Sequence, residues 1–575
     1  MKKIYFLLLL SFFFTFFTYS QNNQKIWSVN SEVYKYITYL YVSEGHALPN
    51  STGPWSTQEL KNMLNVFCGI DEYNGDRPLL QNENNILLYN KIHEILYAPS
   101  RFSTNDNFNF SLQGSLNPEF FFHTNSENFS KESDWYYDFE KRKKLLLLEA
   151  EVFAGNCIYA YSNLSLGYTS ITIDSDLETL FYGSNFMSNI PFLPLKNLSL
   201  MDLNFPFRSF MSAGGDHWSI SAGRDVIRWG HGESGNLFLG GNAIYDNNLK
   251  MSIFYNSFKW SFVSIFYPHS QDLTDSTQND SIDGIKIFMA HRFDFRFFKD
   301  KINMSIAESI LYQNSYGIID LRVYNPVALW HNYYIRGNSN STLDLTFDYT
   351  IIKGLNLYGE WIIDEMVGPG EPKGKNGEGW RPGKNGYLIG VKFINPFRNG
   401  ILKISLEGIY TDPCLYLREE YDSSTRTQGL SFYGHVREFD NNKGINYIKN
   451  CIGYVYGGDC IVGNLKATYK SWKKWTSTVE LFYMAHGIMI NELNSDWSIE
   501  EPILAPSTHD PTYEPSNQDG EIESILRLSI YGDYQILTHL NVYLGLDNYF
   551  NWNKDNVENS MLYDLQVYSG LLFTF

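Results

Sequence analysis

One segment of the chain combines residue types that proteins use to hold sugars. An aromatic ring stacks on the C–H groups of a sugar, while arginine and asparagine donate hydrogen bonds to its hydroxyls. Glycine lets the backbone turn sharply and pack closely, so the segment is typical of a folded loop or constriction. We predict that six of its residues contact a sugar ligand, with a purely structural role as the alternative for each. These candidates, within residues 223–243, are Arg224, Arg228, Trp229, His231, Asn236 and Asn242.

Catalysis by the same segment is disfavoured by its spacing. His231 and Ser234 could join a distant aspartate in a triad, but the Gly-x-Ser-x-Gly of a nucleophile elbow is absent here. The sequence also has no His-Glu-x-x-His, no Cys-x-x-Cys and no phosphate-binding glycine loop. We therefore expect no enzyme activity, no catalytic residue, no metal site and no cofactor.

Four acidic residues pose a similar question later in the chain. Asp344, Asp348, Glu360 and Asp364 alternate with apolar residues on both sides of a turn at 353–354. Because successive side chains of a strand point to opposite faces, this pattern predicts a β-hairpin with one apolar and one acidic face. Paired carboxylates serve glycosidases, but we favour a solvated acidic lumen that attracts cations.

The sequence predicts that strands position most of these residues. The last residues of the chain indicate that these strands belong to a barrel in a membrane. Residues 563–575 alternate apolar and polar side chains and finish on Phe575. A soluble protein has little reason to expose such an apolar face, whereas a barrel in lipid requires one and can close with its last strand. An edge strand of a soluble sandwich is the alternative interpretation.

Alternation of period two begins near Phe108 and continues to the end of the chain. At roughly 25 to 30 residues per strand and loop, it predicts about 16 to 18 antiparallel strands. Residues 366–387 and 491–520 are rich in glycine, proline or acids, and we expect external loops there. Further alternating runs lie at 145–153, 157–168, 402–410, 526–534 and 540–549.

The first residues and the composition fit an exported membrane protein. Lys2 and Lys3 precede an apolar run at 4–17, which predicts a signal peptide over residues 1–20. Aromatic residues make up 17% of the chain, which suits aromatic girdles at two membrane interfaces. The net charge of −18 argues against a nucleic-acid partner.

From about Val29 to Tyr97 the apolar residues have a helical period, and this is the only such stretch of the sequence. Ser56 and Glu59 have the spacing of a capping box, and three apolar stripes repeat at helical intervals. We expect a small bundle of about three helices on the periplasmic side. The stripes are Val33, Ile37, Leu40 and Tyr41; Leu60, Met63, Leu64 and Phe67; and Leu88, Ile92 and Ile95.

The five cysteines leave one pairing open. Cys451 and Cys460 flank a short segment that a disulfide could close, or both could be unpaired strand residues. The other three cysteines show no metal-ligand spacing.

The segment 223–243 resembles a motif of the Wzi-type outer-membrane capsule-assembly proteins. Gly223-Arg224, Trp229-Gly230 and Asn242-Ala243 match in order, but His231 stands where proline is commoner and Arg228 where a second tryptophan is commoner. The resemblance implies a barrel that binds capsular or other surface polysaccharide without catalysis. Similar later segments are 325–332, 338–341 and 354–360, with Asp364.

Together these patterns predict a mostly β protein. We expect a signal peptide at 1–20, a periplasmic helical bundle at 21–100 and a transmembrane antiparallel β-barrel at 101–575, located in the outer membrane. The expected partners are surface polysaccharide, outer-membrane lipids and the barrel-insertion machinery. A porin or substrate channel is the alternative function.

Overall fold

The computed structural model describes the helices, the wall strands and several segments between them. The predicted signal peptide lies outside the described residues, as do the predicted loop 491–520 and most of 366–387. The described residues are 23–71, 75–98, 102–105, 108–125, 142–167, 185–190, 202–204, 208–268, 284–314, 318–330, 339–365, 384–413, 415–416, 430–440, 444–472, 474–487 and 521–575.

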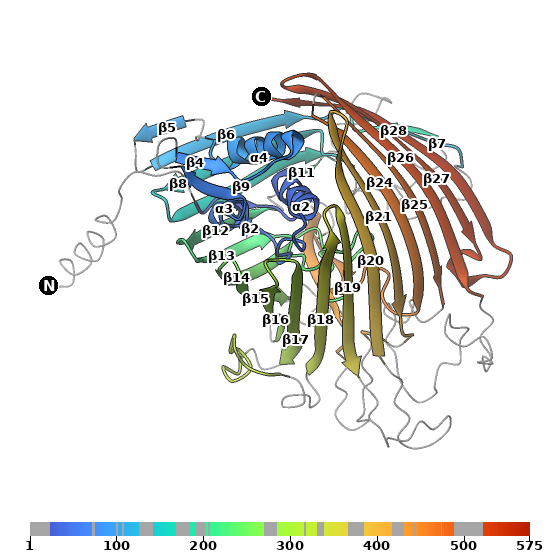
Figure 1. The fold of residues 1–575 in the computed structure, drawn as a ribbon. Coiled ribbons are helices and arrows are strands. Elements are labelled where there is room, and N and C mark those ends of the chain that lie inside the picture. The colour runs from blue at the N-terminus through green and yellow to red at the C-terminus, as the bar shows by residue number, and fades with distance from the viewer. Residues whose placement is uncertain are drawn as a thin grey trace.

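The chain forms a closed antiparallel barrel, with 18 strands in its wall within the described residues (Figure 1). This confirms the predicted fold class and strand number. The wall strands are β6 (Phe108–Leu116) and β7 (Glu119–His123), which flank Pro118 and act as one, β8 (Leu146–Ala154), β9 (Ile158–Gly167), β12 (Ser209–Gly214), β13 (Trp218–Asp225), β14 (Asp246–Phe254), β15 (Phe258–Tyr267), β16 (Ile285–Phe297), β17 (Ile302–Asn314), β18 (Ser339–Ile352), β19 (Leu355–Glu365), β20 (Lys384–Phe397), β21 (Gly400–Thr411), β24 (Cys460–Ser471), β25 (Trp475–His486), β26 (Glu523–Leu537), β27 (Leu540–Trp552) and β28 (Met561–Thr574).

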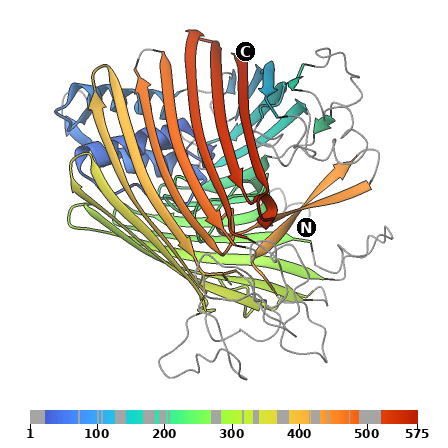
Figure 2. The same cartoon turned by 90° about the vertical axis from the view of Figure 1, so that its right-hand side faces the viewer.

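Shorter elements accompany the wall. β1 pairs with β2, β3 with β4, and β22 with β23, while β5, β10 and β11 extend the main sheet. In Figure 2 the hairpin of β22 and β23 projects beyond the wall. Their bounds are β1 (Ile26–Trp27), β2 (Trp55–Ser56), β3 (Cys68–Asp71), β4 (Gly75–Pro78), β5 (Phe102–Asn105), β10 (Phe186–Ser188), β11 (Asp202–Asn204), β22 (Tyr433–Asp440), β23 (Gly444–Cys451) and the 3₁₀ turn η4 (Lys554–Asn556).

The last strand closes the barrel. β28 pairs with β27 on one side and with β6 and β7 on the other. Gly114 and Phe575 exchange two backbone hydrogen bonds, with N···O distances of 3.0 and 2.9 Å. Tyr563 and Phe573 are exposed on the outer face of β28, whereas Asp564 is buried. The sequence therefore predicted the faces of this strand correctly.

The two ends of the barrel differ. At one end the hairpins have short turns, such as residues 353–354 between β18 and β19. At the other end the connections are longer, such as residues 487–522 between β25 and β26. The predicted hairpin around 353–354 is therefore confirmed, although β20 begins at Lys384, inside the segment predicted as a loop.

Three helices lie at the short-turn end (Figures 1 and 2). They are α2 (Glu32–Glu44), α3 (Thr57–Asn65) and α4 (Glu83–Leu96), and their predicted apolar stripes are mostly buried. The N–H of Ala47 donates to the Asp300 carbonyl at 2.6 Å, and Asn84 Nδ2 donates to the Arg398 carbonyl at 3.3 Å. The helices thus pack on the turns of the wall. Within the described residues, no helix is long and apolar enough to span a membrane.

The structure shows one of the two hydrogen bonds of the predicted capping box. The N–H of Glu59 donates to Ser56 Oγ at 3.2 Å, so α3 begins where the sequence indicated. The Glu59 carboxylate forms an ion pair with Lys259 of β15 instead of turning back on its own helix. α3 is therefore tied to the wall by the residue that was expected to cap it.

No disulfide joins Cys451 to Cys460. Cys451 ends β23 and Cys460 begins β24. Cys460 Sγ is 3.3 Å from the carbonyl oxygens of Tyr456 and Gly458. Of the two possibilities left open by the sequence, the disulfide between these two residues is therefore not the one that forms.

Candidate functional site

The segment between β13 and β14 folds into the lumen, and we call its residues 226–245 the plug. Its ends lie at the long-loop end of the barrel, where β13 finishes and β14 begins. The backbone of Trp229 forms a β-bridge with Leu239, and Arg228 forms one with Gly53 of the N-terminal region. The predicted glycine-rich constriction is therefore a compact loop that reaches a segment from the opposite mouth.

Two glutamates of the wall hold the plug by its backbone. Glu360 of β19 accepts hydrogen bonds from the N–H groups of Leu237 (2.9 Å) and Phe238 (2.7 Å). Glu407 of β21 accepts them from the N–H groups of Glu233 (2.9 Å) and Ser234 (3.0 Å). A carboxylate has lone pairs for several donors, so each glutamate satisfies two buried amides at once. The plug is therefore attached to β19 and β21, several strands away from β13 and β14, which it connects.

An ionic contact secures the middle of the plug. Lys403 Nζ and Lys392 Nζ lie 2.6 and 3.2 Å from Glu233 Oε1. Burial opposes ionisation of Glu233, but these two ammonium groups hold its pKa well below the usual range. Lys392 also donates to the His231 carbonyl at 2.6 Å. The Glu233 carboxylate is therefore ionised at neutral pH and paired with both lysines.

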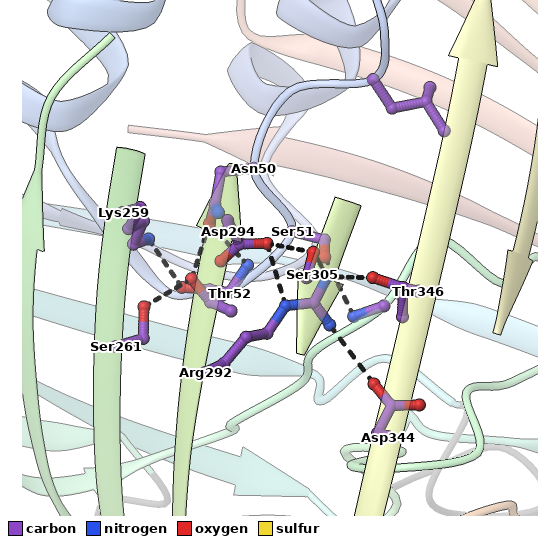
Figure 3. Close-up of polar contacts among 12 residues, drawn as sticks. Asn50, Ser51, Thr52, Lys259, Ser261, Arg292, Asp294, Ser305, Asp344 and Thr346 are labelled. Atoms are coloured by element: carbon purple, nitrogen blue, oxygen red, sulfur yellow. Dashed lines mark hydrogen bonds and ion pairs between the residues drawn. The ribbon is translucent and has the colours of Figure 1, made fainter. Parts of the chain in front are cut away.

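Residues 50–56 of the N-terminal region form a second layer in the lumen, on the short-turn side. Thr52 Oγ1 lies 2.8 Å from Ser261 Oγ of β15, and its carbonyl accepts from Lys259 at 3.3 Å (Figure 3). Ser51 Oγ accepts from the N–H of Gly230 at 3.2 Å. The plug and the N-terminal segment are therefore packed against each other inside the wall.

A buried arginine organises the wall beside this layer. Arg292 of β16 donates to Asp294 (2.9 Å), Ser305 (2.9 Å) and Thr346 (2.8 Å), and its Nη1 is 3.8 Å from Asp344 Oδ2 (Figure 3). Its side chain is only 1% exposed. Burying a guanidinium is costly, and these hydrogen bonds and ion pairs offset much of that cost. This region is therefore a packed polar core.

The predicted acidic lumen needs correction on this point. Asp344, Asp348, Glu360 and Asp364 are all buried, so they do not form a solvated cation-attracting face. Asp348 accepts a hydrogen bond from the N–H of Leu48 at 2.6 Å, and Asp364 accepts one from the N–H of Tyr416 at 3.1 Å. The alternation of the sequence gave the correct face of the strands, but the lumen is filled by the chain itself.

Three of the predicted sugar-contacting residues lie inside the plug and support it. Trp229 is fully buried, with its ring 6.1 Å from that of Phe238. Asn236 Oδ1 accepts from the N–H of Gly232 at 2.8 Å. Asn242 Nδ2 donates to the carbonyls of Cys451 and Gly453, both at 2.8 Å. These contacts correspond to the structural alternative given for each residue.

Of the other three predicted residues, Arg228 and His231 also belong to the plug, and Arg224 lies on β13. Arg228 Nη2 donates to the Val29 carbonyl at 2.7 Å, and His231 is half-buried. Burial and the nearby Lys392 lower the pKa of His231 well below its usual value, so it is neutral at pH 7. Arg224 lies on β13 beside lumen-facing Asp225 and so points to the outer face.

Arg224 keeps an accessible side chain. Its Nε donates to Asn247 Oδ1 at 3.1 Å in an exposed contact, and its guanidinium lies 4.2 Å from the ring centre of Tyr245. The six predicted residues are therefore not gathered around one ligand-sized space. As a set of polysaccharide contacts they remain a prediction. Among the described residues, no group of three or more His, Cys, Asp or Glu could hold a metal ion.

Sequence reasoning missed the residues that hold the plug. Glu407 lies in a run at 402–410 that was recognised only as an alternating strand, and Lys392 and Lys403 carried no motif. A lumen-facing charge in the middle of a wall strand is the signal they shared. That signal becomes specific only when the plug that they contact is known.

Comparison with solved structures identifies the fold. The chain superposes with a TM-score of 0.55 and 12% identity on the Escherichia coli outer-membrane protein Wzi, covering 96% of this chain and 99% of that one. Wzi is described as a carbohydrate-binding β-barrel involved in group 1 capsule assembly. At this identity the likeness shows a shared fold. No family model matches the sequence, and no curated protein matches it.

Other outer-membrane barrels are less similar. The channel DcaP of Acinetobacter baumannii gives a TM-score of 0.35 at 8% identity, covering 83% of this chain and 100% of that one. An anion-selective porin from Comamonas acidovorans gives 0.34 at 9% identity, covering 81% and 100%. The likeness to the Wzi outer-membrane barrel is the one that spans nearly the whole chain among these three structures.

Proposed function

We propose that this chain, which has the fold of the Wzi barrel, binds surface or capsular polysaccharide without catalysis and helps to attach or assemble it at the cell surface. The observation that carries the proposal is the plug. Glu360 and Glu407 hold a folded segment across the lumen, where a diffusion channel needs an open path. The carbohydrate binding described for Wzi supports the same function here.

The proposed orientation follows from the two ends of the barrel. Outer-membrane barrels have short periplasmic turns and longer external loops. On that basis α2, α3 and α4 face the periplasm and the ends of the plug face the exterior. Export by the predicted signal peptide 1–20, insertion by the barrel-insertion machinery and contact with outer-membrane lipids belong to the same proposal.

A two-part measurement tests the function. The purified protein is reconstituted in planar bilayers, and its conductance is recorded with and without surface polysaccharide from the source cells. A parallel pull-down measures binding of that polysaccharide. We expect a low conductance together with binding. A steady, large conductance that ignores the polysaccharide, without binding, would move the protein to the porin class.

The predicted contacts are tested separately. Arg224→Ala removes the predicted residue that is accessible at the long-loop end, and we expect weaker retention of polysaccharide by cells. Arg322→Ala is the matched control, because the Arg322 side chain is 80% exposed and pairs with nearby Asp320 at 2.7 Å. Equal retention by both variants, at equal barrel levels, would remove Arg224 from the site.

A further inference from the structure

A cavity of about 530 Å³ lies in the lumen between α2, the plug and the wall strands β21 and β24–β28. Glu233 of the plug lines one end, and Glu32 and Lys470 line the other, close to the short turns. The Glu32 side chain is 64% exposed, so the cavity reaches solvent at the short-turn end. We propose that this cavity, here called the chamber, binds a short saccharide segment. The inference rests on the proposed function and gives it a site.

The aromatic lining of the chamber fits sugar rings. Tyr36 and Tyr39 come from α2, Tyr531 from β26 and Tyr568 from β28, so aromatic side chains line opposite sides. A tyrosine offers an apolar ring face together with a hydroxyl that hydrogen-bonds. The volume lies within the range of about 300–1,000 Å³ that is usual for small-molecule sites. A few sugar units therefore match both the size and the surface.

Hydroxyl groups occupy much of the remaining wall. Thr468 of β24 and Thr478 of β25 lie within hydrogen-bond distance of each other, with 3.1 Å between their Oγ1 atoms. Ser529 of β26 also lines the chamber. Hydroxyls both donate and accept, as sugar hydroxyls do. The surface thus offers many weak polar contacts with few directional demands, which suits a polyhydroxylated ligand.

The charges of the chamber are nearly balanced. Four lysines and five carboxylates line it, which leaves one net negative charge. Lys403 pairs with Glu233 at 2.6 Å, and Lys470 pairs with Glu32 at 2.6 Å. A site for a bare phosphate or a divalent cation gathers charge of one sign. The balance therefore favours a sugar over an ion.

One lysine is free to meet a ligand. Lys35 of α2 lines the chamber with an exposed side chain, and within the described residues it makes no ion pair or side-chain hydrogen bond. Lys35 can thus donate hydrogen bonds to a ligand without first breaking a contact with the protein.

The test uses oligosaccharides of about two to four sugars, a length that fits a site of this volume, made by partial hydrolysis of the surface polysaccharide. Their binding to the protein in lipid nanodiscs is measured by calorimetry. Tyr531→Ala and Lys35→Ala each remove one chamber contact. Tyr534→Ala lies on the same strand but is exposed on the outer face, and Lys474→Ala lies in an exposed turn; these are the controls.

We expect Tyr531→Ala and Lys35→Ala to weaken binding about threefold to tenfold, the effect of losing roughly one aromatic or polar contact. The two controls should stay within twofold. If all four variants bind like the unmodified protein, the chamber is not the site, while the proposed function stands. If intact polysaccharide binds but no oligosaccharide does, the chamber is again excluded. If neither binds, both proposals fail.

Discussion

The indole of Trp330 lies flat against the imidazole of His291, with ring centres 4.7 Å apart and planes 16° apart. His291 is on β16, next to lumen-facing Arg292, so the stack is on the outer face of the wall. On the same face His291 Nε2 lies 3.4 Å from Glu308 Oε2, and both side chains are buried. A segment outside the barrel, residues 318–330, therefore shields a polar pair from the membrane side; we call it the strap.

Trp330→Ala should destabilise the barrel. The substitution leaves a cavity and exposes the polar pair on the outer face, and a buried tryptophan truncated to alanine costs about 3–5 kcal/mol. Urea unfolding in detergent micelles measures the change. Leu329→Ala is the matched control, because Leu329 is 77% exposed and its loss should change stability by less than about 0.5 kcal/mol. Equal stabilities for the two variants would show that the strap does not cover His291.

Glu360→Ala and Glu407→Ala should each loosen the plug. Each change leaves two backbone N–H groups without their acceptor, at about 1–3 kcal/mol per group. We expect the conductance of single barrels in planar bilayers to rise in discrete openings. Glu480→Ala is the control, because Glu480 pairs with Lys466 of the neighbouring strand, and among the described residues no hydrogen bond or ion pair joins it to the plug. A conductance that stays at the level of the control would mean that the plug is held by other contacts.

Gly114→Leu should impair closure of the barrel. A Cβ at Gly114 would lie 2.4 Å from the ring of Phe575, so a larger side chain must displace the terminal strand. The expected cost is about 1–3 kcal/mol, seen as a smaller fraction of heat-modifiable barrel on gels. At Gly463 a Cβ meets nothing within 4 Å, so Gly463→Leu serves as the control. Adding Phe575→Ala to Gly114→Leu should restore part of the loss.

Lys61 of α3 should titrate near pH 8. Burial lowers its pKa to about 8, although it donates to Asn23 Oδ1 at 2.9 Å. Because the unfolded chain holds this proton up to about pH 10.4, the contribution of Lys61 to stability rises from about pH 8 to pH 10.4 and then levels off. Reductive ¹³C-methylation followed by NMR titration measures the pKa, with Lys61→Arg assigning the signal.

A value near 10.4 would show that Lys61 is solvated. Lys61→Met should remove the pH dependence between pH 8 and 10.4, because methionine keeps the apolar stem and has no proton to lose. Lys474→Met, in an exposed turn, should leave that dependence in place.

The sequence predicted what depends on local periodicity. Alternation predicted β18, β19 and β28 with their correct faces, and helical spacing with Ser56 predicted α3. These features follow from which side chains share a face, so short stretches are enough to reveal them. The closed barrel could be predicted from these strands, because an apolar face that points outward is stable in lipid and strands cross a lipid bilayer only as a closed barrel.

The candidate site was less predictable, because its contacts join residues far apart in the chain. Glu407 holds the plug from about 170 positions away, and a lumen-facing acid looks the same in sequence whether it meets water or a backbone N–H. Trp229 has the residue type of a sugar platform but serves as a core residue. The strap shows the same limit, since nothing local indicates that Trp330 packs on the outside of the wall.

The bridge between Gly53 and Arg228 joins two segments that enter the lumen from opposite mouths. The N-terminal segment arrives from the short-turn end and the plug from the long-loop end, and Ser51 adds a hydrogen bond to Gly230. A continuous chain of backbone contacts therefore runs through the interior, from the short-turn end of the barrel to the long-loop end. Pulling the helices away from the barrel must therefore break these contacts or move the plug.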